Sequence, residues 1–199
     1  MDPSVIAPIV IGLSGMIGLP FALWSRRKDG PQKAEDLCRH LVAIGVEASM
    51  HPKDPNEPEK RSLWQRTMGI IKVANQNIDS IEVIGAVHQY GVNYSLDYLV
   101  SKSGTMAGAK KQKTRLKRKK SSLFKGKGID LEWRGDDYLA QRLTFDYRLK
   151  NKILESIPKD SIEIIADPKQ EYVRIKTPYS LPTPAAFEVI NIIAGHVRY

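Results

Sequence analysis

The first twenty-four residues constrain this chain most strongly. Residues 3–24 carry no charged side chain, and Ser25, Arg26, Arg27 and Lys28 follow directly. At a rise of about 1.5 Å per residue, such a stretch forms a helix of roughly 33 Å, which matches a hydrocarbon layer of about 30 Å. Backbone amides in lipid need partners within their own segment, and a helix supplies them. The sequence therefore predicts a single transmembrane helix over residues 3–24.

The basic cluster after this segment predicts its orientation. Arg26, Arg27 and Lys28 resist translocation, which places the short amino terminus outside and residues 25–199 in the cytoplasm. Trp24 suits the aromatic belt at the inner membrane interface. We therefore expect a membrane protein with one span and a cytoplasmic domain.

Two other interpretations of residues 3–24 stay open. A cleaved signal peptide would carry its positive charges before the apolar core, whereas here they come after it. The glycine and proline content is also compatible with a hairpin-like helix buried in the protein. If the segment spans a membrane, Gly12, Gly15 and Gly18 form a small-residue face that favours self-association of the helix.

The rest of the chain is long enough for one domain with its own core. Residues 25–32 are predicted to form a short basic tether that contains Asp29-Gly30-Pro31, and residues 33–199 to form the cytoplasmic domain. The single cysteine, Cys38, excludes an internal disulfide. It lies in a helical pattern, so we interpret it as a packing residue.

Hydrophobic periodicity predicts an α+β domain with one antiparallel sheet covered by helices. Thr183 is the expected cap of the last helix, and Asp136 the expected cap of a long helix that ends at Pro158. From Tyr94 onward the expected order is β-β-α-β-β-α. The helices are expected at 33–44, 136–157 and from 184, and the strands at 46–50, 69–74, 80–87, 94–100, 129–133, 161–166 and 172–176.

The positive charge is concentrated in one segment. The chain has a net charge of +9, but residues 102–127 contain eleven Lys and Arg and no acid, so the remainder carries −2. The strand patterns 94–100 and 129–133 flank this segment. We therefore predict an antiparallel hairpin whose long, flexible tip, residues 103–127, is a basic loop.

Three interpretations of the basic loop compete: contact with anionic lipid, non-specific contact with nucleic acid, and a solvated loop without a specific role. Lipid is favoured over nucleic acid because the loop lacks Tyr and Trp side chains on which bases could stack. The residues predicted to contact anionic lipid or phosphate are Arg26, Arg27, Lys28, Lys110, Lys111, Lys113, Arg115, Lys117, Arg118, Lys119 and Lys120.

Catalytic motifs are missing from the sequence. It has no glycine-rich phosphate loop, no zinc-ligand spacing and no Gly-x-Ser-x-Gly elbow, so we predict no catalytic, cofactor-binding or metal-binding residue. Asp136 and Asp137 are interpreted as a helix cap and a first-turn acid, and Asp146 as an i,i+4 partner of Lys150. An enzyme site assembled from dispersed residues remains an alternative, with Asp136, Asp137, His88 and Tyr90 as its candidates.

These expectations combine into one leading hypothesis. The chain is predicted to be a single-pass membrane-anchored protein whose cytoplasmic α+β domain binds or scaffolds an unidentified protein partner. Its basic loop adds a contact with anionic lipid headgroups. The alternatives are a membrane-tethered nucleic-acid-binding protein and the enzyme just described.

Overall fold

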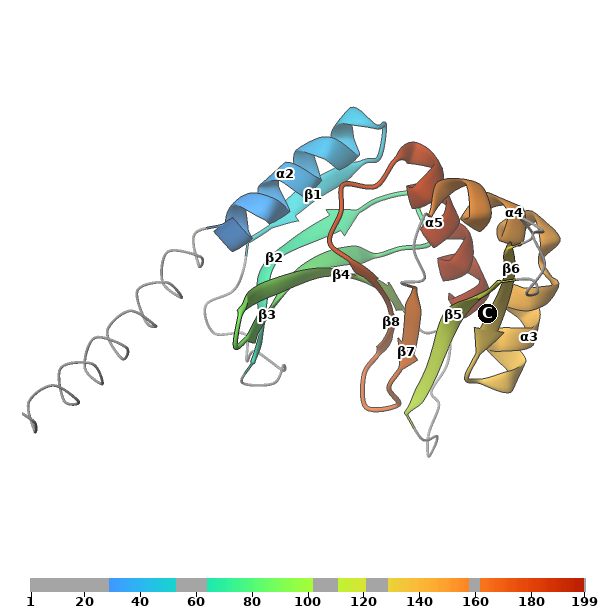
Figure 1. Ribbon diagram of the computed structural model, residues 1–199. Coiled ribbons are helices and arrows are strands. Elements are labelled where there is room, and N and C mark those ends of the chain that lie inside the picture. The colour runs from blue at the N-terminus through green and yellow to red at the C-terminus, as the bar shows by residue number, and fades with distance from the viewer. Residues whose placement is uncertain (1–28, 53–63, 102–110, 121–128, 158–161, 199) are drawn as a thin grey trace, which may run out of the picture.

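A computed structural model of the chain describes residues 29–52, 64–101, 111–120, 129–157 and 162–198 (Figure 1). These residues form one eight-stranded antiparallel sheet, in the order β1-β2-β3-β4-β8-β7-β5-β6, and four helices. The α+β class with an antiparallel sheet is therefore confirmed. The strands are β1 Ala48–His51, β2 Gln65–Val73, β3 Ser80–His88, β4 Gly91–Ser101, β5 Gln112–Lys120, β6 Ile129–Arg134, β7 Glu163–Ala166 and β8 Tyr172–Pro178, and the helices are α2 Asp29–Ala43, α3 Asp137–Phe145, α4 Tyr147–Ser156 and α5 Pro184–Arg198.

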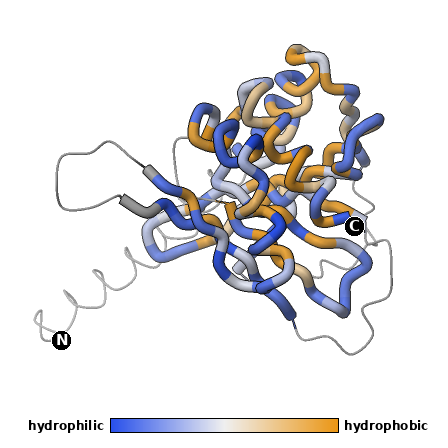
Figure 2. The backbone as a smooth tube through the Cα atoms, turned by 90° about the vertical axis from the view of Figure 1, so that its right-hand side faces the viewer, coloured by the Kyte–Doolittle hydropathy of each residue, from blue (hydrophilic) through white to orange (hydrophobic). Residues whose placement is uncertain are grey.

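The helices lie on one side of a curved sheet (Figure 1). Alternate strand residues, such as Leu96, Tyr98 and Val100 of β4, point to that side and join a single hydrophobic cluster with residues of all four helices. In Figure 2 the hydrophobic stretches gather where helices and sheet meet. The other strand residues point to the opposite face of the sheet, and charged side chains of the strands can lie on that face.

Local capping signals are confirmed. The Asp136 carboxylate accepts hydrogen bonds from the amides of Tyr138 and Leu139 at 3.1 and 3.5 Å, and the Thr183 hydroxyl accepts one from the amide of Ala186 at 3.2 Å. Both side chains satisfy amides that the first turn of a helix leaves without partners. Short-range chemistry therefore predicted these two helix starts correctly.

Helix α2 begins earlier than the sequence indicated. Asp29, Gly30 and Pro31 form its first turn instead of breaking it. Proline is tolerated there because first-turn amides have no intrahelical acceptor. Gly30 is buried, and a Cβ at this position would lie 2.5 Å from Sδ of Met68 in β2. Packing against the sheet thus extends the helix through residues 29–32, half of the predicted tether, and residues 25–28 lie outside the described part of the chain.

The predicted helix over 136–157 is two helices. Asp146 adopts an extended conformation between α3 and α4, and its side chain accepts a hydrogen bond from the Leu149 amide at 2.9 Å. The predicted pair between Asp146 and Lys150 is wrong, because Asp146 caps α4 and contacts His196, whereas Lys150 pairs with Asp130 at 2.6 Å. A residue that starts a helix cannot serve as a mid-helix i,i+4 partner.

The predicted hairpin between residues 94–100 and 129–133 is also wrong. Strand β4 pairs with β3 and β8, whereas β6 pairs with β5. Nine residues of the predicted flexible loop, Gln112–Lys120, form β5 inside the sheet. Thr114 and Leu116 are both 2% exposed and face the core, so alternation with the cations makes this segment a strand. The order from Tyr94 is therefore β-β-β-α-α-β-β-α.

No helix within the described ranges is long and apolar enough to cross a membrane. The predicted transmembrane segment, residues 3–24 with Gly12, Gly15 and Gly18, lies outside those ranges. The single span and its orientation therefore stay predictions.

Candidate anion-binding surface

Strand β5 presents a row of cations on the sheet face opposite the helices. Lys113, Arg115 and Lys117 alternate with the buried Thr114 and Leu116. The side chains of Lys113 and Arg115 are 45% and 53% exposed. A strand with this alternation buries its small and apolar residues and leaves its charges on the other face.

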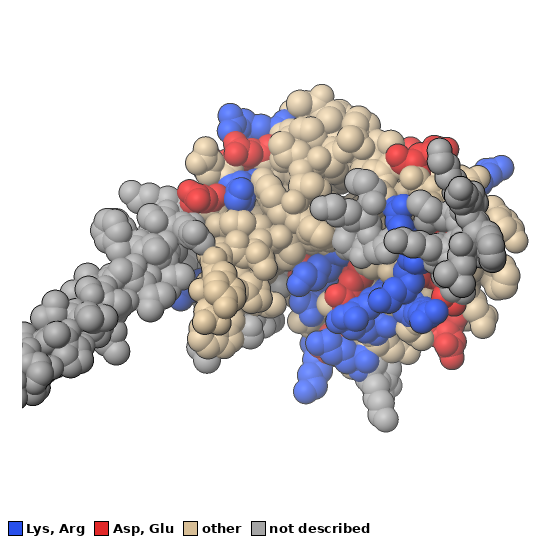
Figure 3. Space-filling view, in the orientation of Figure 1, with Lys and Arg blue, Asp and Glu red and all other residues tan. Residues whose placement is uncertain are grey.

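Neighbouring strands add further cations to the same face. Arg134 of β6 lies directly opposite Arg115, and Lys176 of β8 lies directly opposite Glu163 of β7. Figure 3 shows Lys and Arg side chains gathered over β5, β7 and β8, with acidic side chains among them. We call this group the basic surface: Lys111, Lys113, Arg115, Lys117, Arg134, Arg174 and Lys176.

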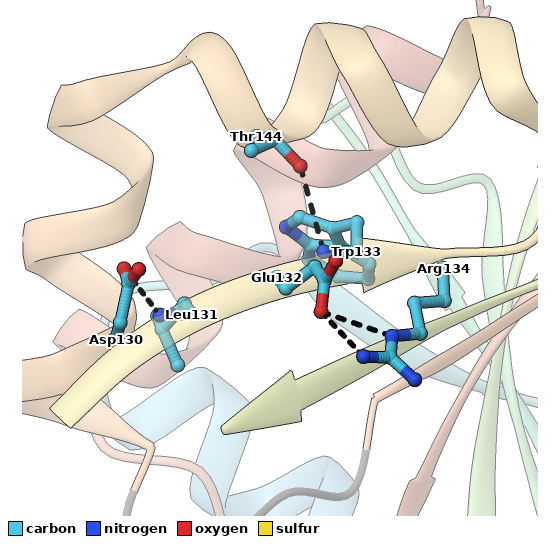
Figure 4. Close-up of polar contacts among 6 residues, drawn as sticks. All are labelled: Asp130, Leu131, Glu132, Trp133, Arg134 and Thr144. Atoms are coloured by element: carbon cyan, nitrogen blue, oxygen red, sulfur yellow. Dashed lines mark hydrogen bonds and ion pairs between the residues drawn. The ribbon is translucent and has the colours of Figure 1, made fainter. Parts of the chain in front are cut away.

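Carboxylates hold several of these cations in place. Glu163 contacts both Lys113 and Arg115, the latter with Nε 3.2 Å from Oε1. Arg134 Nη2 lies 2.9 Å from Glu132 Oε2, and Figure 4 shows its guanidinium turned toward that carboxylate. These pairs order the long side chains and leave part of their donor capacity for a ligand.

Two further ion pairs border the basic surface. Arg174 Nη1 lies 3.6 Å from Oδ2 of Asp97, whose side chain is only 2% exposed. Lys111 Nζ lies 3.9 Å from Asp167 Oδ2 in the turn after β7. The side chains of Arg174 and Asp97 are largely buried, whereas the Lys111 side chain is exposed. Water therefore screens the pair of Lys111 and Asp167 more strongly than the pair of Arg174 and Asp97.

Like charges face one another within the basic surface. Arg115 and Arg134 are direct cross-strand partners, an arrangement that costs stability, and their guanidinium groups turn apart to Glu163 and Glu132. Partial burial and the nearby charges of Arg115, Lys176 and Lys111 lower the pKa of Lys113. The potential around Lys113 is therefore positive despite the contact with Glu163.

The structure brings together some of the residues predicted to contact anions. Lys111, Lys113, Arg115 and Lys117 share one surface, although the sequence indicated a flexible loop at this place. Arg118 does not join them, because it points to the helix side and donates to the carbonyl oxygen of Ile157 at the end of α4. The side chains of Lys119 and Lys120 lie outside the described part of the structure, as do residues Arg26, Arg27, Lys28 and Lys110.

Sequence reasoning missed the contributions of Arg134, Arg174 and Lys176. A usable signal was present, since Arg174 and Lys176 alternate with the buried Val173 and Ile175 along β8. That pattern places both cations on the face opposite the helices but does not reveal which strands lie beside them. Their proximity to β5 comes from the strand order.

The residues named for a dispersed enzyme site are not brought together. Asp136 caps α3 at the end of β6, whereas His88 and Tyr90 lie at the turn between β3 and β4, with β8, β7 and β5 in between. The Tyr90 side chain is 90% exposed. Within the described residues, no group of three or more His, Cys, Asp or Glu side chains could hold a metal ion.

Comparisons of the chain with protein-family models, with curated proteins and with solved structures found no match. The functional argument therefore depends on the chemistry of the basic surface.

Proposed function

We propose that this protein is anchored in a membrane by residues 3–24 and that its α+β domain binds or scaffolds a partner there, with the basic surface contacting anionic lipid headgroups. The observation that carries the proposal is the convergence of cations from β5, β6 and β8 on one sheet face, with Arg115 directly opposite Arg134. Glu163 and Glu132 offset part of the repulsion between these two arginines, and an anion bound at this face would offset more of it.

The number and the exposure of the cations support a membrane as the source of the anions. Each Lys or Arg near an anionic leaflet contributes about 1 kcal/mol, so several of them acting together give useful affinity where none alone would. The exposed positions of Lys111, Lys113, Arg115 and Lys117 allow their charges to reach a flat surface. An interface of this kind needs no deep pocket.

The start of α2 supports a close approach to the membrane. Because the helix begins at Asp29, only residues 25–28 separate it from Trp24, and such a connection spans at most roughly 18 Å. A domain of this size has a radius of gyration of about 15 Å. Anchoring through residues 3–24 would therefore keep the domain within reach of the headgroups.

A vesicle-binding experiment tests the proposal on the full chain. The protein is placed in phosphatidylcholine nanodiscs and titrated with neutral or phosphatidylglycerol-containing vesicles. We expect salt-sensitive binding to the anionic vesicles alone, weakened roughly tenfold or more in Lys113→Gln/Arg115→Gln because two charges are lost.

The matched control removes two cations from the helix side. Arg39 of α2 is 76% exposed, and Arg148 of α4 is also exposed, so Arg39→Gln/Arg148→Gln changes the net charge equally. Affinity within about twofold of the parent is expected for this control, because both groups lie away from the basic surface. Equal weakening by the two double variants would reduce the effect to net charge and contradict the proposed surface.

Nucleic acid is the competing source of phosphates. A gel shift with the same variants shows whether the protein binds nucleic acid at all, and a salt series shows whether that binding depends on contacts with phosphates. Tight, salt-dependent binding of nucleic acid without binding to anionic vesicles would replace the lipid proposal with the membrane-tethered nucleic-acid binder.

A further inference from the structure

Two aromatic side chains at one end of the sheet are largely exposed. Trp64, directly before β2, is 69% exposed, and Tyr90, in the turn between β3 and β4, is 90% exposed. His88 pairs with Gly91, so Gln89 and Tyr90 form a two-residue turn and Tyr90 lies at the tip of the hairpin. Neither aromatic residue belongs to the basic surface.

Trp64 and Tyr90 lie close to each other. The carbonyl oxygen of Trp64 accepts a hydrogen bond from the Val87 amide at 2.9 Å, and Tyr90 follows Val87 by three residues. The Cα atoms of the two aromatic residues are therefore separated by at most roughly 18 Å. We call Trp64 and Tyr90 the aromatic pair.

Helix α2 begins at the same end of the sheet. A Cβ on Gly30 would lie 2.5 Å from Sδ of Met68, and a Cβ on Gly69 would overlap Ala34, so α2 runs alongside β2 in the same direction. Trp64 precedes Met68 by four residues, a distance of at most about 14 Å along the strand. Figure 1 shows the start of α2 and the turn between β3 and β4 on the same side of the molecule.

Contacts of Lys33 attach the start of α2 to this part of the sheet. The Tyr179 hydroxyl donates a hydrogen bond to the Lys33 carbonyl oxygen at 2.9 Å. The Lys33 ammonium lies 5.1 Å from the ring centre of Tyr94 and 5.0 Å from that of Tyr179. Tyr94 belongs to β4, the strand that follows Tyr90, so the first turns of α2 are tied to the hairpin that carries the aromatic pair.

The predicted span connects to the domain at this end. Residues 25–28 separate Trp24 from Asp29 and reach at most roughly 18 Å. Trp and Tyr are enriched at membrane–water interfaces, because their apolar rings enter the lipid while the indole N–H and the phenol hydroxyl stay hydrated. The aromatic pair thus combines the side chains that suit this layer with a position beside the anchored end of the domain.

We infer that Trp64 and Tyr90 insert into the interfacial layer of the membrane next to the predicted span and fix the orientation of the domain on it. This assignment rests on the proposed function, because it takes residues 3–24 as the anchor. It adds a contact that does not depend on lipid charge to the charge-dependent contact of the basic surface. Two separate contacts restrict rotation of the domain about its short connection to the span.

Fluorescence quenching by brominated phosphatidylcholine tests the insertion on the full chain reconstituted in vesicles. In the variant Trp24→Phe, emission comes from Trp64 and Trp133, and Trp133 is only 5% exposed. We expect bromine atoms near the headgroups to quench this emission roughly twofold more than bromine atoms near the bilayer centre, because an interfacial ring stays outside the middle of the hydrocarbon layer. Adding Trp64→Phe to this variant should remove the quenching.

Moving the indole to other surface positions makes the test specific. In the background Trp24→Phe/Trp64→Phe, the substitution Tyr90→Trp should restore quenching by the bromine atoms near the headgroups. Tyr147→Trp in the same background is the matched control, since Tyr147 begins α4 on the helix side of the sheet and is 71% exposed. Its emission should not respond to brominated lipid.

The outcomes separate the insertion from the proposed function. Absence of quenching for Trp64 or for Tyr90→Trp, or equal quenching for Tyr147→Trp, overturns the insertion and leaves the span and the basic surface in place. Emission from Trp64 that is shifted to the blue but insensitive to bromine would identify a protein surface as the contact and overturn the assignment to lipid. Loss of the full chain from the vesicles on alkaline carbonate washing overturns the anchor, and with it both the proposed function and the insertion.

Discussion

Asp146 connects three helices through one side chain. Its Oδ1 accepts a hydrogen bond from the Leu149 amide at 2.9 Å, and its Oδ2 lies 2.9 Å from Nε2 of His196 in the last turn of α5. Partial burial alone would raise the pKa of Asp146, but the hydrogen bonds from Leu149 and His196, the charge of His196 and a further backbone bond lower it. The ionised carboxylate is therefore favoured by the fold, and it ties α5 to the junction of α3 and α4.

We expect Asp146→Asn to cost about 1 kcal/mol of unfolding free energy at neutral pH. Asparagine caps helices as well as aspartate does, so the loss reports the contact with His196 and not the cap. Because folding lowers the pKa of this carboxyl, its contribution is complete above about pH 4 and is lost as the pH falls through the folded-state pKa. Urea titrations across this range measure the difference between the parent and the variant.

The matched control is Asp137→Asn in the first turn of α3. Asp137 is exposed, and its expected role is a favourable interaction with the helix dipole, which contributes about 0.5 kcal/mol. A loss in Asp146→Asn no larger than the loss in Asp137→Asn would contradict the assigned contact.

At the level of elements, Gly135 determines how β6 meets α3. Its φ is +139°, and a Cβ there would overlap the carbonyl oxygen of Lys113 and lie 2.7 Å from Cα of Thr114. The backbone of residue 135 thus packs directly on the backbone of β5. Asp136, the next residue, donates its amide to the Thr114 hydroxyl at 3.2 Å. This close contact fixes β5 at the position from which Lys113 projects.

Gly135→Ala is expected to destabilise the protein by about 3 kcal/mol or more, since it adds a backbone clash to an unfavourable conformation. The suitable comparison is Gly45→Ala: Gly45 also has a positive φ, +86°, but a Cβ there meets nothing within 4 Å. That substitution should cost only about 1 kcal/mol. Thermal or urea unfolding of the two variants measures the contribution of the clash, and equal losses would show that β5 does not constrain residue 135.

At the scale of the whole molecule, the sheet brings distant segments into one surface. Strands β5 and β8 are separated in sequence by β6, two helices and β7, yet the order β8-β7-β5-β6 places their cations together. Residues 3–24, which precede the N-terminal end of α2, are predicted to add a membrane span. The proposed function needs both features, because the span gives proximity and the basic surface gives a charge-dependent contact.

The predicted span leads to a fractionation experiment. We expect the full chain to remain with the membrane pellet after alkaline carbonate washing, and a variant lacking residues 3–24 to be released into the supernatant. Extraction without detergent would expose the apolar surface of the whole spanning helix to water, and the free-energy cost of that transfer is too large. Full-length protein in the supernatant would exclude the span, whatever the basic surface binds.

The sequence by itself determined the features that depend on near neighbours. The caps Asp136 and Thr183 and the packing role of Cys38 could be predicted, since each follows from a few adjacent side chains. The sequence pattern of β4 indicated a half-buried strand, but residues 96–100 are all buried because β4 lies in the middle of the sheet. The sequence also identified Lys111, Lys113, Arg115 and Lys117 as anion-contact candidates. Their row along a strand was missed because a run of cations was interpreted as a loop.

Only the tertiary structure decided which strands are neighbours. Alternation assigns a residue to one face of a strand but leaves its pairing open, and pairing depends on how the whole hydrophobic set is buried. For that reason Arg174 and Lys176 were not associated with β5, and Glu163 was not recognised between Lys113 and Arg115. Arg118 was expected among the anion-contact residues of a loop, whereas it donates to the Ile157 carbonyl on the helix side. The basic surface is a property of the assembled sheet, because its charges come from segments that meet only when the core closes.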